Sequence, residues 1–519
     1  MNFPTPSNWR TWEPNPIVVK ELRQAVRSWA ITGMLMVFLA LLFITVVLSL
    51  LGQSINVSPN QALGRDIFMW FLGGVSVVGF ILIPSYVGGR LMAERLDGNV
   101  DMLYITTLSP ARIIRGKLLC GTCLVLLFFS VCAPFMVFTN LLRGIDLPTV
   151  FVLLAIAFLL SLLCLQAAIF LSCLPASKGL KIFVGLPASG FMVSLVGMMV
   201  GLSVTFTREG IGSRLASSGF WWPMIGSLFL GLLLFGFMHL AAIALVSPPS
   251  ANRALPLRSY TTGAWLLTLI VASIWSASIA HIGPVGAWAT IATGVLIAGL
   301  LVSVSEGDDV SARIRRTIPI SINKRALAFF FYSGSAGGLA WTVLLAVATT
   351  LVASLMFDGN LFDALSIRWS GRTMHGSFVS EMAEVVNVQV TLFLYALAYC
   401  LYGLFIHRRF QPHRPAIFAG LCSVALPALW AIVPNLVLFF LNQLSWDALQ
   451  ERQLGNIFNV AFLKDRSFTL DHQMCALVMV AFGLLLNAEW FLAQRRAFVP
   501  LVPEAAAIPP TTATPPPLP

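Results

Sequence analysis

Long apolar stretches alternate with short polar ones along most of the chain. About twelve of them approach 20 residues, the length that an α-helix needs to cross the roughly 30 Å hydrocarbon core of a bilayer. The first six are expected near residues 29–51, 67–87, 118–142, 149–173, 180–204 and 220–246. The other six are expected near residues 262–281, 284–304, 336–356, 386–406, 415–442 and 473–494. The pattern therefore predicts an all-α polytopic membrane protein built from two six-helix halves.

The polar stretches divide the chain into four parts. Residues 1–28 precede the first span, and the sequence Pro-Pro-Ser-Ala-Asn-Arg at residues 248–253 closes the first half. We therefore expect one six-span unit over residues 29–250 and a second over residues 251–496. Residues 497–519 are rich in Pro, Ala and Thr, a composition typical of a disordered tail.

The end of the N-terminal segment has the pattern of an amphipathic helix. From residue 15 onward, apolar residues recur at helical spacing. The opposite face carries the polar residues Lys20, Glu21, Arg23, Gln24 and Arg27. This pattern predicts a helix that lies on the membrane surface. An ordinary basic lead-in to the first span is the alternative.

The composition is that of a membrane protein, and the expected membrane topology accounts for the positive net charge. Hydrophobic residues make up 58% of the chain and charged residues 10%, whereas a soluble domain has roughly 25% charged residues. The net charge is +11, but in a multi-pass protein an excess of Lys and Arg reports topology. With the N-terminus in the cytosol, most of the 32 Lys and Arg residues fall on the cytosolic side. Both termini are therefore expected in the cytosol, and the expected partner is the lipid bilayer rather than nucleic acid.

The sequence lacks the motifs of common catalytic and nucleotide-binding sites. A nucleotide-binding loop ends in Gly-Lys-Ser or Gly-Lys-Thr, but Gly116-Lys117 is followed by two leucines. The six histidines are scattered, and the eight cysteines fall in or at the ends of apolar spans. We therefore expect no enzymatic activity, no cofactor, no metal site and no disulfide framework.

One histidine, His239, falls in the middle of the sixth span. An ionisable residue inside a membrane is a functional candidate, because its burial is costly. A histidine that is hydrogen-bonded within the helix bundle is the simpler interpretation, and we favour it. The scarcity of other charged residues within the spans argues against an ion-coupled carrier.

The polar segment at residues 88–117 is the main candidate functional site. It lies between the second and third spans and carries charges of both signs. Gly98 suits a sharp turn, because glycine tolerates backbone angles that other residues avoid. A Ser-Pro break at residues 109–110 is followed by a basic turn at residues 112–117. We expect a soluble partner to bind the protein here, on the cytosolic side.

The order of motifs in this segment resembles that in the membrane subunits of ABC-2 type transporters. The matching stretches are Glu-Arg-Leu-Asp-Gly-Asn-Val-Asp-Met-Leu at residues 94–103, Thr-Thr-Leu-Ser at 106–109 and Gly-Lys at 116–117. Residues 15–23 resemble the amphipathic first helix of such permeases, so the resemblance covers about residues 15–250. The chain departs from the family pattern at Asn99, where Thr is usual, and at Thr107, where Pro is usual.

The resemblance implies that a separate ABC-type ATPase subunit, present in two copies, docks on this cytosolic segment. Closure of the ATPase pair would then rock the membrane helices and export or flip a substrate. Lys117 would anchor the third span at the lipid headgroups. The residues implied in ATPase coupling are Glu94, Arg95, Asp97, Gly98, Asp101, Thr107, Ser109 and Lys117. A solvated loop with helix caps is the alternative interpretation.

The second half leaves the number of permease units open. Residues 305–325 occupy the position that corresponds to residues 88–117, but they do not repeat its motif. The chain is therefore either a fused pair of permease units or one unit with an accessory bundle that pairs with a second copy. We favour the homodimer, because only one clear coupling motif is present.

These observations lead us to expect a multi-pass permease subunit of an ABC-2 type exporter, with an unidentified substrate, in a bacterial inner membrane. A membrane scaffold that anchors a soluble complex without transporting anything is the alternative. An ion-coupled secondary transporter is a third hypothesis, which the scarcity of charge within the spans disfavours.

Overall fold

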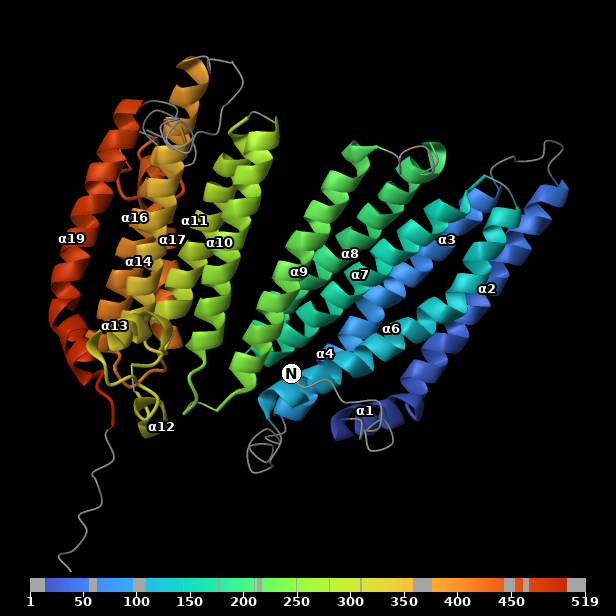
Figure 1. The fold of residues 1–519 in the computed structure, drawn as a ribbon, viewed down its shortest axis with the longest axis horizontal. Coiled ribbons are helices and arrows are strands. Elements are labelled where there is room, and N and C mark those ends of the chain that lie inside the picture. Colours follow the sequence, from blue (N-terminus) through green and yellow to red (C-terminus); the bar gives the residue numbers. More distant parts are fainter. Residues whose placement is uncertain are drawn as a thin grey trace, which may run out of the picture. The chain divides into compact units, whose positions relative to one another are not determined.

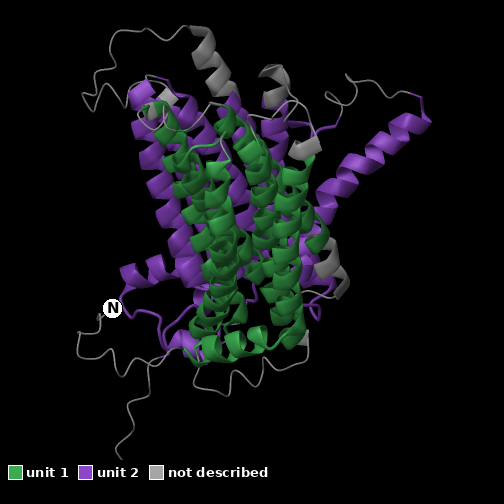
Figure 2. Cartoon of the chain, turned by 90° about the vertical axis from the view of Figure 1, so that its right-hand side faces the viewer, with its two compact units in different colours: residues 1–248 green, residues 249–519 purple. Residues whose placement is uncertain are grey.

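The computed structural model describes most of the chain and contains helices, with no strand among the residues that it describes (Figure 1). These residues are 15–55, 63–96, 109–142, 144–174, 178–209, 211, 217–248, 250–279, 281–308, 310–357, 376–442, 453–460 and 466–501. The chain forms two compact units, Met1–Pro248 and Pro249–Pro519, which Figure 2 colours separately. The boundary falls within the proline-containing segment between the two halves.

In unit 1 the residues that the structure describes form a short helix followed by six spans. Its helices are α1 (Pro16–Val26), α2 (Trp29–Ile55), α3 (Leu63–Val77), η2 (Val78–Leu82), α4 (Ile83–Leu96), α6 (Pro110–Leu141), α7 (Leu147–Cys173), α8 (Lys178–Glu209) and α9 (Ser218–Val246). The segments α3, η2 and α4 form one continuous span, in which η2 is a single π-helical turn. Aromatic side chains fill the core of the unit, where Phe68, Phe80 and Phe128 are fully buried.

In unit 2 the described residues form six further spans and two short helices between the second and third of them. Its helices are α10 (Ala254–Ile279), α11 (Gly283–Val304), α12 (Ala312–Arg315), α13 (Ile322–Phe331), α14 (Ser335–Phe357), α16 (Gly376–Phe410), α17 (Ile417–Phe440) and α19 (Arg466–Ala497). The largest core cluster joins α11, α14, α16 and α19, and includes Leu300, Trp341 and Leu401.

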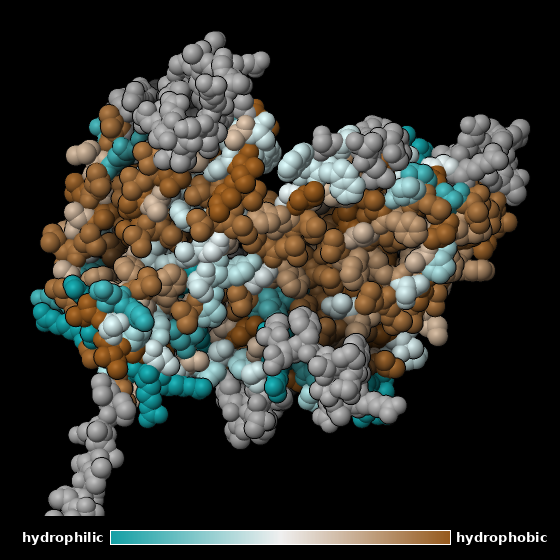
Figure 3. Space-filling view, viewed as in Figure 1, coloured by the Kyte–Doolittle hydropathy of each residue, from teal (hydrophilic) through white to brown (hydrophobic). Residues whose placement is uncertain are grey.

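The surface of the helices is that of a membrane protein. Among the described residues, 12 helical segments are long and apolar enough to cross a bilayer, and each coincides with a predicted span. In α2 only 11% of the most apolar window is buried, and Met36, Leu41 and Phe43 are exposed. Figure 3 shows apolar side chains, in brown, covering the middle of the helices on the visible face. Continuous apolar surface of this extent requires lipid around it, so the prediction of an all-α multi-pass membrane protein is confirmed.

The helices extend further into the polar segment 88–117 than the hydropathy pattern predicts. Helix α4 continues to Leu96, and α6 begins at Pro110 rather than near residue 118. The expected basic turn at residues 112–117 is therefore the start of α6, so that prediction is wrong. A hydropathy window stops at charged residues, whereas a helix continues through them where their side chains find partners.

His239 in α9 is engaged within the helix bundle of unit 1. Its Nδ1 atom lies 3.3 Å from Oε1 of Gln166, a fully buried residue of α7. Its ring also stacks on that of Phe235, with 6.3 Å between the ring centroids. The interpretation of His239 as a histidine hydrogen-bonded inside the bundle is therefore confirmed.

Candidate functional site

The candidate site begins with α1, which packs against the first turns of α6. Asn15 caps α1, because its Oδ1 atom accepts a hydrogen bond from the N–H of Ile17 at 3.1 Å. The Nδ2 atom of the same residue donates to the carbonyl oxygen of Arg112 in α6 at 2.9 Å. One side chain therefore both begins α1 and attaches it to α6. Figure 1 shows α1, in dark blue, lying near the lower ends of α2 and α6.

Gly116 allows α1 and α6 to approach closely. A Cβ atom at this position would lie 2.8 Å from Cγ2 and 2.9 Å from Cβ of Ile17. Carbon atoms normally remain at least about 3.5 Å apart, so any other residue here would displace α1 or Ile17. The close approach places the next residue, Lys117, directly beside α1.

Lys117 joins three helices through two ion pairs. Its Nζ atom lies 3.0 Å from Oε1 of Glu21 in α1 and 2.8 Å from Oε2 of Glu94 in α4. The side chains of Lys117 and Glu21 are only 4% and 8% exposed, whereas that of Glu94 is 31% exposed. Charged groups buried to this extent persist only when they are paired, because their removal from water is costly. The two ion pairs therefore hold α1, α4 and α6 together.

Arg90 makes a second connection between α4 and α1. Its Nη1 atom donates to the hydroxyl oxygen of Tyr86 at 2.9 Å, one helical turn earlier in α4. Its Nη2 atom donates to Oε1 of Gln24 in α1. The guanidinium group thus donates hydrogen bonds to acceptors on both helices.

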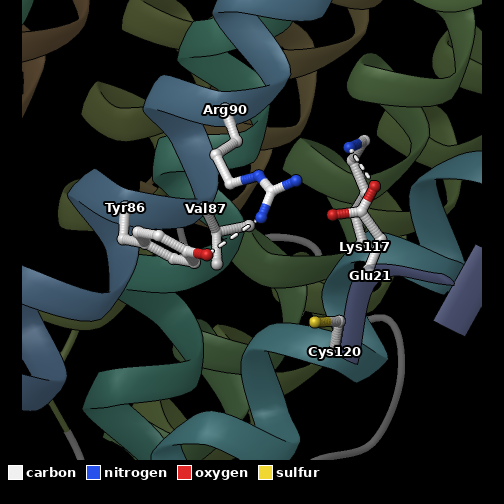
Figure 4. A pocket seen from close by; sticks show the side chains of 6 residues that line it. All are labelled: Glu21, Tyr86, Val87, Arg90, Lys117 and Cys120. Atoms are coloured by element: carbon white, nitrogen blue, oxygen red, sulfur yellow. Dashed lines mark hydrogen bonds and ion pairs between the residues drawn. The ribbon is translucent and has the colours of Figure 1, made fainter. Parts of the chain in front are cut away.

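Side chains of α1, α4 and α6 line a small cavity between these helices: Glu21, Tyr86, Val87, Arg90, Lys117 and Cys120 (Figure 4). Its volume is about 10 Å³, which leaves room for roughly one water molecule (Figure 4). Three charged residues line this cavity, and Glu94 joins them through its ion pair with Lys117. We refer to these four residues as the charged cluster: Glu21, Arg90, Glu94 and Lys117. Two carboxylates and two cations balance each other within the cluster, so it carries no net formal charge.

Both helix ends that flank residues 97–108 are anchored. Near the end of α4, Arg95 donates from Nη1 to the carbonyl oxygen of Cys173, the last residue of α7. At the start of α6, Ser109 acts as the N-cap, and its Oγ atom accepts a hydrogen bond from the N–H of Arg112 at 3.4 Å. A force applied to residues 97–108 would therefore reach α1, α4, α6 and α7.

The structure describes half of the residues implied in ATPase coupling. The described ones are Glu94, Arg95, Ser109 and Lys117. The others lie outside the described residues: Asp97, Gly98, Asp101 and Thr107. The expectation that Lys117 anchors α6 at the lipid headgroups is wrong, because Glu21 and Glu94 enclose its ammonium group.

Sequence reasoning missed Glu21 and Arg90 as members of the site. The helical pattern assigns Glu21 to the polar outer face of α1, whereas its side chain is buried against α6. Glu21 and Lys117 are 96 positions apart, so no local pattern connects them. The one available signal is Gly116, a small residue beside a lysine at the start of an apolar span.

Unit 2 has a buried ion pair of its own in the region of residues 305–325. The Nη2 atom of Arg258 in α10 lies 2.7 Å from Oε2 of Glu306, which also accepts a hydrogen bond from the N–H of Gly334 at 2.8 Å. Burial raises the pKa of the Glu306 carboxyl above its ordinary value, although Arg258 and the Gly334 N–H oppose the shift. Arg258 also donates to the carbonyl oxygen of Phe330 at 3.1 Å.

The second acidic residue of that region, Asp308, is also engaged within unit 2. Its carboxylate accepts hydrogen bonds from the hydroxyl of Ser335 and from Nε1 of Trp490, the latter at 2.8 Å. Glu306 and Asp308 therefore connect the segment that follows α11 to α10, α14 and α19. Asp309 lies outside the described residues.

The chemistry of the charged cluster is ionic, and its effect is to fix helix positions. Among the residues that the structure describes, no group of three or more His, Cys, Asp or Glu side chains is placed to hold a metal ion. Comparisons with protein-family models, curated proteins and solved structures returned no match. What the site does is therefore inferred from its own residues and geometry.

Proposed function

We propose that this protein is the permease subunit of an ABC-2 type exporter in a bacterial inner membrane, with an unidentified substrate. The observation that carries the proposal is the pair of contacts that Lys117 makes with Glu21 and Glu94. These contacts connect α1 to both helices that flank residues 97–108, the segment whose sequence resembles an ATPase-docking segment. A soluble subunit that binds there is connected mechanically to three helices at once.

In the proposed mechanism, ATP binding draws two ATPase subunits together and displaces residues 97–108. Helices α4 and α6 move with the segment, because it joins their ends. Helix α1 follows, because separating Lys117 from Glu21 would leave a buried charge unpaired, at a cost of about 3–5 kcal/mol. The shift of these helices moves substrate across the membrane, and the ATPase supplies the energy.

The proposal is tested by affinity capture of the tagged protein in mild detergent. We expect the native chain to capture an ABC-type ATPase, and the double variant Asp97→Ala/Asp101→Ala to lose it. These two residues are preferable to Glu94 and Arg95, whose side chains also hold unit 1 together. An unfolding midpoint of the variant equal to that of the native protein is required as well, so that loss of capture reports loss of docking rather than loss of folding.

A matched control removes two carboxylates from a segment that the sequence assigns to the opposite side of the membrane. Asp358→Ala/Asp363→Ala changes the segment between the third and fourth spans of unit 2, and we expect it to retain the ATPase. Failure of the native chain to capture any ATPase, under conditions that preserve a known permease complex, would overturn the proposal. That result would favour the membrane scaffold instead.

A further inference from the structure

Unit 2 contains a large pocket where α13 meets the beginning of α14 and the end of α19. Its volume is about 610 Å³, within the range of small-molecule binding sites. Figure 1 shows α13 beside the lower end of α19. The pocket combines an apolar floor with a basic rim, and each part points to a different portion of one ligand.

The floor is built from phenylalanine rings that pack edge to face. Phe329 lies at its centre, with ring centroids 6.2 Å from Phe491 and 5.5 Å from Phe498. Phe498 is only 7% exposed, although it follows the end of α19. The N–H of Leu501 donates to the carbonyl oxygen of Arg315 at 3.1 Å and so holds this stretch against α12. The floor is therefore a packed surface.

Three arginines form the rim of the pocket. Arg325 is half-buried, and Arg495 and Arg496 are exposed. Among the described residues, none of the three forms an ion pair. Glu306 and Asp308, the acidic residues that the structure describes in the preceding segment, are already engaged in their own contacts. The rim therefore presents three positive charges to a ligand.

The pocket lies at the level where the hydrocarbon core ends. The last apolar span of the chain ends at Ala497, so Arg495 and Arg496 occupy its final turn. Around α13, Ile320, Ile322 and Leu327 are 76%, 73% and 62% exposed. Large exposed apolar residues beside arginines are typical of a helix at the lipid–water interface.

We propose that this pocket binds one anionic phospholipid from the surrounding bilayer. The guanidinium groups pair with the phosphate, for which arginine has suitable geometry and charge, and the acyl chains lie against the phenylalanine floor. A free phosphate ion would use the rim but leave the apolar floor uncovered. A zwitterionic lipid would cover the floor but would neutralise less of the positive charge on the rim. This inference concerns unit 2 and does not depend on ATPase coupling.

The inference is tested by titrating the purified, delipidated protein in detergent with phosphatidylglycerol or phosphatidylcholine and following thermal unfolding. We expect phosphatidylglycerol to raise the midpoint at lower concentration than phosphatidylcholine. In the triple variant Arg325→Gln/Arg495→Gln/Arg496→Gln, the apparent affinity for phosphatidylglycerol should fall on the order of 100-fold. The matched control Arg313→Gln/Arg409→Gln/Arg414→Gln removes three exposed cations from the same membrane side of unit 2 and should bind as the native protein does.

A second variant keeps all the charges and fills the pocket. Ala326 lines it, and Ala326→Trp should weaken phosphatidylglycerol binding while leaving the lipid-free midpoint unchanged. Equal responses of the native protein to the two lipids would overturn the inference. So would an equal effect of inorganic phosphate, because the site would then bind the free ion. Loss of binding in the matched control would also overturn it, since general surface charge would then explain the effect.

Discussion

Replacing Lys117 with methionine leaves the Glu21 carboxylate without its partner, in a site where its side chain is 8% exposed. We expect K117M to lower the stability by about 3–5 kcal/mol, because an unpaired buried charge is costly. Adding Glu21→Gln removes that charge and should recover a large part of the loss. Thermal unfolding of the native protein, both single variants and the double variant in one detergent measures the coupling. Additive effects of the two substitutions would contradict the buried ion pair.

The burial of Glu306 leads to a prediction about how the stability of the protein depends on pH. Its pKa is raised by burial, so the folded protein holds the proton more tightly than the unfolded chain does. The corresponding stabilisation is complete below the unfolded value of about 4.3 and is lost as the pH rises through the folded pKa. Glu306→Gln removes this titration. We therefore expect the unfolding midpoint of the native protein, relative to that of E306Q, to decrease as the pH rises.

The comparison with E306Q has an outcome that would contradict the prediction. A difference in midpoint that grows with rising pH would mean that Arg258, at 2.7 Å, lowers the carboxyl pKa by more than burial raises it. The matched control is Glu489→Gln, because Glu489 is an exposed carboxylate of α19. This substitution removes a carboxylate of α19 and leaves the pair of Glu306 and Arg258 unchanged.

At the scale of whole elements, the packing of α1 on α6 depends on the absence of a side chain at Gly116. Gly116→Ala should push Ile17 away and make α1 exchange its amide hydrogens roughly 5- to 100-fold faster. Gly89→Ala in α4 is a matched control, because a Cβ atom there meets nothing within 4 Å. Hydrogen exchange followed by mass spectrometry measures both variants. Unchanged exchange in α1 of G116A would show that the helix is held by other contacts.

The membrane spans could be predicted from sequence because each depends on its own composition. The stretch 147–173, for example, is apolar along its whole length. It can therefore be recognised as a span without knowledge of the helices that it contacts. The ends of the helices could not be predicted in the same way. Helix α6 begins at Pro110 because Ser109 caps it and because Lys117 pairs with carboxylates. Both contacts involve polar groups, and a hydropathy pattern ends the predicted span at such groups.

The charged cluster could be predicted only in part, for a related reason. Glu94 and Lys117 stand out because they carry charge beside apolar spans. The third partner, Glu21, belongs to the polar face of the amphipathic helix α1, which the periodicity assigns to solvent, and it meets Lys117 across 96 positions. The contact depends on how α1 packs on α6, which is decided by the shape of Gly116 and Ile17 rather than by periodicity.

At the scale of the whole molecule, the two units differ in how they use the polar segment between their second and third spans. In unit 1 the charged cluster secures the helices that flank residues 97–108, the segment to which the proposed function assigns the ATPase. In unit 2 the corresponding Glu306 and Asp308 contact Arg258 and Trp490 of their own unit. This difference supports one coupling segment in each chain. An exporter with two ATPase subunits then needs two copies of this chain.

Native mass spectrometry of the captured complex tests this stoichiometry. We expect two copies of this chain and two ATPase subunits, because each copy supplies one segment at residues 97–108. A fused pair would instead give one copy with two ATPase subunits. The variant Asp97→Ala/Asp101→Ala separates the same two arrangements independently. In a homodimer it removes both docking surfaces and releases both ATPase subunits, whereas in a fused pair the region 305–325 of unit 2 would retain one. A complex of one variant chain with one ATPase subunit would therefore contradict the homodimer and assign a coupling role to unit 2.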